Sequence, residues 1–361
     1  MAATSSAPAL PPWLAALRDE PGIFPPLTIE VDGARDPLTA RCAWAGRSWT
    51  FLAVPLKLVT PKRLAAALAT AGDGGPSLPP LVLTEYLKER DVDRIAEAGA
   101  SGIDLCGNGI VQVPGELLVR RAGQPCQDRR AGANGSAAIR NVYRGTSGLV
   151  ARTFLLTPGF ETNAAVRAVV RDRGGSVSPG TVSKVLGALE EDLVIARDNG
   201  GGRLVDAEEL ARRLRENFRP PAVTRTGAFC YRPGRGAAAL VAAAERAKVR
   251  LVLDGRSSAS AYATRAASDA PRLYCTDLRR LEKAAADVLE PVDRYADLAV
   301  EETDDPAAYF DAREQQGEES GPAAASPVQV WLELSAGDAR ERDAAEQVLR
   351  RILAGVAEAK R

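Results

Sequence analysis

The sequence contains no histidine among its 361 residues. This absence excludes Ser-His-Asp and Cys-His catalysis, histidine-ligated zinc and acid–base chemistry by an imidazole. No run approaches the roughly 18 consecutive apolar residues that span a bilayer, and no basic start leads into an apolar segment typical of a secretory signal. We therefore expect a cytoplasmic protein that does not contact a membrane and does not use the common hydrolase mechanisms.

Cysteine is also scarce, and its pattern matches no ligand motif. The five cysteines are odd in number, far apart and never in a C-x-x-C pair, so neither a disulfide framework nor a cysteine-only zinc site is indicated. We expect reduced thiols, and we predict no metal and no other cofactor. The cysteines are Cys42, Cys106, Cys126, Cys230 and Cys275.

Charge is balanced over the whole chain but not along it. The 47 basic and 47 acidic residues give a net charge of zero. Between Arg120 and Arg152, seven arginines stand against one acid, a local charge of +6; between Val300 and Ser320, eight acids stand against one arginine, a local charge of −7. The basic segment favours contact with DNA phosphates, and the acidic segment predicts a solvated loop.

Two breaks in composition divide the chain. Proline and glycine interrupt otherwise periodic sequence at residues 129–136 and again at 219–223. A chain of this length is able to bury more than one core. We therefore predict an α/β multi-domain protein with three domains, which are residues 1–135, 140–220 and 225–361.

The first domain alternates helices with strands, which predicts a mixed sheet flanked by helices. Its central order of a helix, three strands, a helix and a strand resembles the core of the restriction-endonuclease-like fold. The predicted helices are residues 13–18, 61–71 and 92–98, and the predicted strands are residues 27–31, 38–43, 49–54, 81–84, 102–113 and 116–119.

That resemblance implies a place for a nuclease site. Active members carry an acid and then an acid-x-Lys triplet on the third strand, so that two carboxylates hold a divalent metal. The matching triplet here is Pro55-Leu56-Lys57, so its acid is missing. Asp104 and Glu116 offer carboxylates elsewhere in the domain. We predict a degenerate domain that acts as a scaffold or in dimerisation, and the alternative is a metal-dependent nuclease.

A turn is predicted where Asn108-Gly109 lies between two apolar stretches. This pair is typical of a type I′ hairpin, because both central residues of that turn need positive φ. We favour a structural turn over a ligand site for the segment from Ile103 to Gly109.

Three helices and a hairpin follow the basic segment. Gly174-Gly175 supplies a tight turn after the second helix. Ser178 is an N-cap for the third helix, and Pro179 follows at the first helical position, where its missing N–H costs nothing. The predicted helices are residues 147–156, residues 162–171 and a third helix that begins at Ser178, followed by strands at 193–197 and 203–205 and a helix from 206 to 218.

This order predicts a winged helix-turn-helix, from about Arg140 to Phe218, that binds double-stranded DNA. The third helix has one apolar face, so its opposite face is free to enter a major groove about 12 Å wide. The residues of the apolar face are Val182, Val185, Leu186, Leu189 and Leu193. We predict groove contacts from the third helix, contacts from the arginines of the wing, and contacts to the DNA backbone from three further arginines. These residues are Ser178, Thr181, Ser183 and Lys184 in the groove, Arg197 and Arg203 on the wing, and Arg140, Arg144 and Arg152 on the backbone.

The alternative for this segment is a winged helix that binds protein. Glu190, Glu191 and Asp192 favour that alternative, and the basic segment favours DNA. The whole chain could then be a module that binds an effector or a toxin.

The third domain again alternates helices and strands without a glycine-rich phosphate loop. Asp254-Gly255, followed by Ser257 and Ser258, is able to hold an anion at a helix N-terminus, as in nucleotidyltransferase-like folds; we favour a capped helix start. The predicted elements are helices 237–247, 257–264 and 278–288, strands 249–253 and 272–275, and a terminal helix 338–357.

Segments in all three domains resemble bacterial proteins of the AbiEi antitoxin family. The matching stretches are Ile103–Gly109, Thr181–Leu186, Leu253–Gly255 with the helix that follows, and Ser326–Gln329. The resemblance implies a DNA-binding antitoxin that represses its own promoter and opposes a nucleotidyltransferase toxin. We expect a homodimer on a palindromic site, bound to the nucleoid when on DNA.

Overall fold

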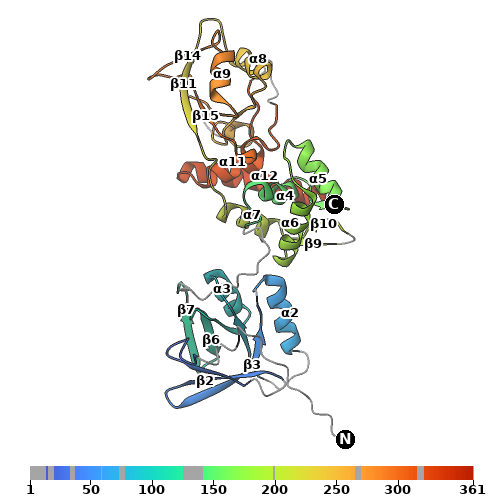
Figure 1. The fold of residues 1–361 in the computed structure, drawn as a ribbon, viewed down its shortest axis with the longest axis vertical. Coiled ribbons are helices and arrows are strands. Elements are labelled where there is room, and N and C mark those ends of the chain that lie inside the picture. Colours follow the sequence, from blue (N-terminus) through green and yellow to red (C-terminus); the bar gives the residue numbers. More distant parts are fainter. Residues whose placement is uncertain are drawn as a thin grey trace. The chain divides into compact units, whose positions relative to one another are not determined.

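The computed structural model describes residues 14, 20–32, 37–57, 59–72, 78–124, 141–197, 200–264, 270–314 and 321–360. The chain folds into two compact units, Met1–Ala138 and Ile139–Arg361 (Figure 1). The predicted α/β multi-domain class is confirmed, with three sheets among the described residues. The second unit contains both the predicted central and C-terminal domains, so the boundary between those two stays a prediction. The predicted helix at residues 13–18 lies outside the described residues, apart from Leu14.

The first unit contains a seven-stranded sheet in which every strand lies beside its sequence neighbour. The first three strands are antiparallel, the third to fifth are parallel, and the last three are antiparallel. Two helices connect the parallel strands, as a parallel pair requires. The strands are β1 (Thr28–Asp32), β2 (Thr39–Trp44), β3 (Arg47–Pro55), β4 (Pro80–Thr84), β5 (Ser101–Asp104), β6 (Gly109–Val113) and β7 (Leu117–Arg121), and the helices are α2 (Pro61–Gly72) and α3 (Glu89–Glu97).

Apolar side chains cover both faces of this sheet. Helices α2 and α3 pack Leu64, Val92 and Ile95 against one face (Figure 1). Phe24 and Leu27, which precede β1, are buried against the other face. Burial of each such side chain contributes roughly 1.5–3 kcal/mol, so both faces contribute to the stability of the unit.

The Asn-Gly turn is not of the predicted type. Positive φ angles occur at Gly107 and Gly109, and Asn108 has no positive φ. The loop is instead built around the buried carboxylate of Asp104, which accepts hydrogen bonds from the backbone N–H of Cys106 and of Asn108, both at 2.8 Å. The type I′ prediction is therefore wrong, because a side chain inside the fold supplies the hydrogen bonds that fix the loop.

The cysteines differ in state, so the prediction of reduced thiols throughout is wrong. Cys106 is disulfide-bonded, and the prediction for Cys126 lies outside the described residues. Cys42, Cys230 and Cys275 are free thiols. Burial raises the pKa of both Cys42 and Cys275 to about 12, so these two thiols are poorly reactive.

The second unit begins with three helices and a small sheet. The predicted helices at 147–156 and 162–171 are confirmed within two residues, and so are the helix after Ser178 and the hairpin that follows it. The strands form the order β8-β10-β9. The elements are α4 (Gly145–Phe154), β8 (Gly159–Phe160), α5 (Asn163–Asp172), α6 (Pro179–Glu191), β9 (Ile195–Ala196), β10 (Gly202–Leu204) and α7 (Ala207–Glu216).

Local sequence explains where these helices begin. The side chains of Thr162, Ser178 and Asp206 each accept a hydrogen bond from the backbone N–H three residues later, at 2.8 to 3.1 Å. Each bond satisfies one of the free N–H groups of the first helical turn. Gly175 lies so close to Val170 that a Cβ would come within 2.8 Å of the valine side chain. The turn between α5 and α6 therefore requires glycine.

The rest of the second unit has a five-stranded sheet in the order β12-β13-β15-β11-β14. Its own apolar core lies between this sheet and helices α8 and α9. The elements are β11 (Arg225–Tyr231), α8 (Ala237–Ala247), β12 (Leu251–Leu253), η1 (Ala259–Ala261), β13 (Arg272–Cys275), α9 (Leu278–Ala284), β14 (Leu289–Pro291), β15 (Leu298–Glu302), α10 (Pro306–Tyr309), α11 (Pro327–Ser335) and α12 (Ala339–Ala359).

Two predictions for this region need correction. The helix expected at 257–264 is only the short 3₁₀ turn η1. Where the structure describes it, the acidic segment is not simply a solvated loop: it contains the end of β15 and all of α10, and several of its acids have structural partners. Asp305 caps α10 at 2.9 Å, Glu301 pairs with Arg272 at 3.1 Å and Asp311 pairs with Arg173.

One apolar core joins the small helical bundle to the C-terminal helices. Phe154 of α4, Leu189 of α6, Trp331 of α11 and Val348 of α12 belong to the same buried cluster. Helices α4 to α7 therefore pack on the C-terminal part of this unit instead of standing apart from it. No helix among the described residues is long and apolar enough to cross a membrane.

Candidate nucleic-acid interface

Helix α6 has one buried and one exposed face, as its sequence predicts. Val182, Val185, Leu186 and Leu189 are fully buried and pack on α4 and α5. The prediction is wrong for Leu193, which follows the helix with a positive φ and is 46% exposed. Ser183 and Lys184 are exposed on the other face. This face is therefore available to a ligand as far as the described residues of the second unit are concerned.

Small side chains at the start of α6 leave room for a ligand to come close to the helix backbone. Gly180 has only the Ser178 hydroxyl within 4 Å of the position that a Cβ would take, and Gly187 has nothing within that distance. The hydroxyls of Ser178 and Thr181 lie 2.9 Å apart, and Ser178 also caps the helix. Small side chains and the positive end of the helix dipole thus lie together, an arrangement that favours an anion such as a phosphate.

The hairpin after α6 carries the two predicted wing arginines. Arg203 lies in the central strand β10, opposite Gly159 and Ala196, and its side chain is exposed. Arg197 is half-buried at the end of β9. Gly201 approaches β8 so closely that a Cβ would lie 2.0 Å from the carbonyl oxygen of Phe160. The hairpin is therefore held against β8 by a contact that only glycine allows.

The three predicted backbone arginines have different environments. Arg144 is exposed at the start of α4. Arg140 lies outside the described residues. Arg152 is only 6% exposed, and its guanidinium donates to Gln329 Oε1 at 2.6 Å and to the carbonyl oxygen of Ala307 at 3.3 Å. Arg152 cannot reach a phosphate from this position, so its assignment to the DNA backbone is corrected.

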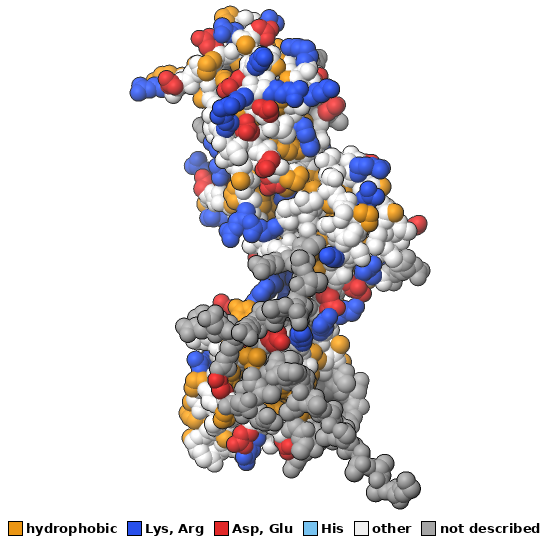
Figure 2. Space-filling view, in the orientation of Figure 1, with side chains coloured by type: hydrophobic (Ala, Val, Ile, Leu, Met, Phe, Trp, Pro, Cys, Tyr) orange, Lys and Arg blue, Asp and Glu red, His pale blue; other side chains and the backbone are white. Residues whose placement is uncertain are grey.

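Other arginines of the basic segment also have internal partners. Arg120 pairs with Asp93 at 2.7 Å, and the Arg121 guanidinium lies 6.0 Å from the centre of the Phe24 ring. On the face of the second unit drawn in Figure 2, Lys and Arg side chains are spread among acidic and apolar ones. In the described part of the segment, not every arginine therefore offers a free positive charge to DNA.

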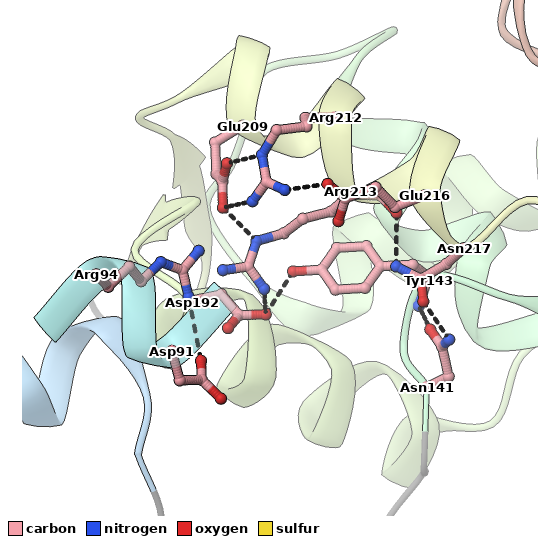
Figure 3. Close-up of polar contacts among 10 residues, drawn as sticks. All are labelled: Asp91, Arg94, Asn141, Tyr143, Asp192, Glu209, Arg212, Arg213, Glu216 and Asn217. Atoms are coloured by element: carbon pink, nitrogen blue, oxygen red, sulfur yellow. Dashed lines mark hydrogen bonds and ion pairs between the residues drawn. The ribbon is translucent and has the colours of Figure 1, made fainter. Parts of the chain in front are cut away.

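The acid at the end of α6 is also engaged internally. Asp192 accepts hydrogen bonds from the Tyr143 hydroxyl and from Arg213 Nη1, each at 2.6 Å. Arg213 Nε pairs in addition with Glu209 at 2.6 Å, and Arg212 contacts the same Glu209 at 2.7 Å (Figure 3). Asp192 thus ties α6 to α7, and its charge is not presented to a partner.

Arg213 is the centre of this network, and sequence reasoning did not find it. Its side chain is 1% exposed, and its guanidinium lies 5.7 Å from the centre of the Tyr143 ring. Burial, and then the neighbouring Asp192, raise the pKa of the Tyr143 hydroxyl. The i, i+4 spacing of Glu209 and Arg213 was the available signal, but Asp192 and Tyr143 are distant in sequence.

A second buried network joins α4 to the C-terminal sheet. Arg152 contacts Gln329, Gln329 Nε2 donates to Glu333 Oε1 at 2.6 Å, and the backbone N–H of Gly255 donates to Glu333 Oε2 at 2.8 Å. Burial, and then the charge of Asp254, raise the pKa of Glu333 to about 7. Burial lowers the pKa of Arg152 to about 10. Two of the stretches on which the antitoxin prediction rests, at 253–255 and 326–329, thus meet in one internal network.

Asp254 has the structural role that we favoured. Its carboxylate accepts a hydrogen bond from the backbone N–H of Ser257 at 2.7 Å, and the residue is 3% exposed. Only the three-residue helix η1 follows. The arrangement is a capped turn. The alternative, an anion site at a helix N-terminus, needs a longer helix than the one that follows Asp254.

The predicted nuclease carboxylates are separated and occupied. Asp104 is fully buried, and its two oxygens accept four hydrogen bonds of 2.8 to 2.9 Å, including one from the backbone N–H of Leu87. Glu116 pairs with Arg47 at 2.6 Å and accepts from the Trp49 indole at 2.9 Å. Among the described residues, no group of three or more acids or cysteines is placed to hold a metal.

Comparison with known proteins adds no assignment. No protein-family model matches the chain, and searches of curated proteins and of solved structures give no match. The likeness to the antitoxin family therefore rests on the sequence stretches given above.

Proposed function

We propose that residues 141–218 form a winged helix-turn-helix that binds double-stranded DNA through α6. The observation that carries the proposal is the two-sided character of α6: four fully buried apolar residues on one face, and Ser183 and Lys184 exposed on the other. A single helix with a small polar face fits a major groove about 12 Å wide.

The proposed contacts combine base reading with phosphate binding. Ser183 and Lys184 lie on the face that would enter the groove, and the capped start of α6 directs N–H groups towards a phosphate. The short hairpin with Arg197 and Arg203 is the proposed wing, where arginine suits a phosphate or a narrow minor groove. Arg144, exposed before α4, is the remaining proposed phosphate contact.

We propose a regulatory and not a catalytic role for the whole chain. The strand order and directions of β1 to β5, with α2 and α3, support the restriction-endonuclease-like assignment of the first unit. The bonded state of Asp104 and the ion pair of Glu116 favour a scaffold over the nuclease alternative. The sheet with α8 and α9 is assigned, on the sequence resemblance alone, to a nucleotidyltransferase-like C-terminal part.

The antitoxin role is the more specific part of the proposal. It includes a cytoplasmic homodimer on a palindromic operator, repression of the protein's own promoter, and a nucleotidyltransferase toxin as partner. Its support is the set of matching sequence stretches, two of which lie in the buried network of Gly255 and Gln329. A protein that does not bind DNA in the test below would favour the alternative, a module that binds an effector or a toxin.

The test compares exposed cations on α6 and the wing with matched cations elsewhere. Lys184→Ala and Arg203→Ala should each weaken binding to the DNA upstream of the protein's own gene by about tenfold at physiological salt, because each loses a charged hydrogen bond worth about 1.5 kcal/mol or more. Lys283→Ala and Arg246→Ala, exposed on α9 and α8, serve as controls. Equal binding by all four variants would contradict the assigned surface.

A further inference from the structure

A cavity of about 530 Å³ lies between α7 and the C-terminal helices α11 and α12. Trp331, Leu349 and Leu353 supply its apolar lining, and α7 supplies the charged lining. The volume is within the range of about 300–1,000 Å³ that is usual for small-molecule sites.

Trp331 places a hydrogen-bond donor at the wall of the cavity. The residue is 2% exposed and lines the cavity. Its indole N–H donates no hydrogen bond to any residue that the structure describes. The indole nitrogen is not one of the buried polar atoms that lack a partner, so it is open to water or to an acceptor on a ligand in the cavity.

The charged residues of α7 fall into two groups. Glu209 is paired with Arg212, and Asp206 caps the helix. Glu208 and Arg215 also line the cavity, and neither forms an ion pair or a side-chain hydrogen bond within the described part of the chain. The cavity therefore presents one free carboxylate and one free guanidinium.

Glu208 and Arg215 are spaced for a ligand with two charged ends. They are seven positions apart in the sequence, so they lie on the same face of α7 and roughly 10 Å apart along its axis. Three residues of extended peptide span about the same distance, at roughly 3.3–3.6 Å per residue. Acid and base at opposite ends of a cavity with one charged and one apolar wall match the two termini of a short peptide.

We propose that this cavity binds a short apolar peptide of about three residues, with its free amino group at Glu208 and its free carboxylate at Arg215. The Trp331 indole N–H donates to a peptide carbonyl, and the central side chain packs on Leu349 and Leu353. The inference does not rest on DNA binding, because every group that it uses lies outside the α6 face.

Titration calorimetry on the full-length protein tests the proposal with the tripeptide Ala-Leu-Ala as the probe. Three forms are compared: free at both ends, N-acetylated, and C-amidated. The free peptide should bind with a saturable signal, and blocking either end should weaken binding at least tenfold, since each block removes one charged contact. Trp331→Phe should weaken all three forms alike.

Two surface variants identify which end lies where. In Glu208→Gln, acetylation of the peptide should no longer weaken its binding, whereas amidation still should. In Arg215→Gln, amidation should no longer weaken binding, whereas acetylation still should. Both residues are exposed, so these variants should fold even if Trp331→Phe does not. Arg219→Gln, an exposed arginine beyond α7, is the control and should bind like the unaltered protein. Absence of a saturable signal at millimolar peptide, or equal affinity for the three forms, would overturn the proposal.

Discussion

Replacing Arg213 by methionine should destabilise the second unit strongly, whereas the same replacement at Arg212 should not. The two arginines are neighbours on α7 and both pair with Glu209. The Arg213 side chain is 1% exposed and also pairs with Asp192, whereas the Arg212 side chain is 35% exposed. Both substitutions remove one positive charge. A difference between the two free energies of unfolding therefore reports the difference in burial.

The expected magnitudes follow from that difference in burial. Removing one partner of a buried ion pair leaves an uncompensated buried charge, here on Asp192, and costs about 3–5 kcal/mol. An exposed pair of the Arg212 kind is worth about 0.2–1 kcal/mol. With a urea dependence of about 1–3 kcal/mol per molar, the Arg213→Met midpoint should fall by about 1–5 M.

Urea unfolding followed by far-UV circular dichroism measures both variants in the full-length protein. Two units need not unfold together, so the transition that Arg213→Met shifts is assigned to the second unit. An equal and small shift for both arginines would refute the reasoning, because burial would then contribute nothing. Asp192→Asn in the Arg213→Met background should recover part of the loss, since it removes the unpaired charge.

Three other predictions concern stability in the two units. The pKa of Glu333 is raised from 4.5 to about 7 in the folded state. Protonation of Glu333 therefore stabilises the fold fully below about pH 4.5, and this stabilisation is lost as the pH rises through 7. Between pH 5 and 8 the free energy of unfolding should fall on the order of 2–3 kcal/mol, and Glu333→Gln should abolish this fall. Asp104→Asn should lower the melting temperature of the first unit, because each buried donor left without an acceptor costs about 1–3 kcal/mol. Gly201→Ala should destabilise the hairpin and weaken DNA binding, whereas Gly355→Ala, which has nothing within 4 Å on α12, should stabilise the second unit by about 0.5–1 kcal/mol.

Each of these has a control or a contradicting outcome. Glu346→Gln, at an exposed position of α12, should leave the pH dependence unchanged. A melting temperature of Asp104→Asn equal to that of the unaltered protein would mean that the four hydrogen bonds are not needed. If Gly201→Ala melted and bound DNA normally, the contact between the hairpin and Phe160 would not matter.

The sequence predicted those parts of the fold that depend on near neighbours. Ser178 and Asp206 begin helices because their side chains bond N–H groups three residues away, and Gly175 allows a turn against Val170, five residues back. The apolar spacing of α6 likewise indicates which of its faces is buried. Such features are local in the chain and can be recognised by inspection.

The parts that could not be predicted depend on distant residues. Arg152 was assigned to DNA because it lies in a basic segment, but Gln329, 177 residues away, buries it. Asp192 counted as a free acid, but Arg213 pairs with it. The candidate DNA surface is therefore smaller than the charge pattern implied: Lys184, Arg203, Arg197 and Arg144, with the hydroxyls at the start of α6.

Binding to the protein's own upstream DNA across a salt series tests the central claim most directly. Each phosphate contact contributes a slope of about −0.9 to the logarithm of the binding constant against the logarithm of salt. The four described cations predict a slope of about −3 to −4 for each bound protomer, reduced by about 0.9 in Lys184→Ala. A slope near zero, or a slope that Lys184→Ala does not change, would contradict DNA recognition by α6.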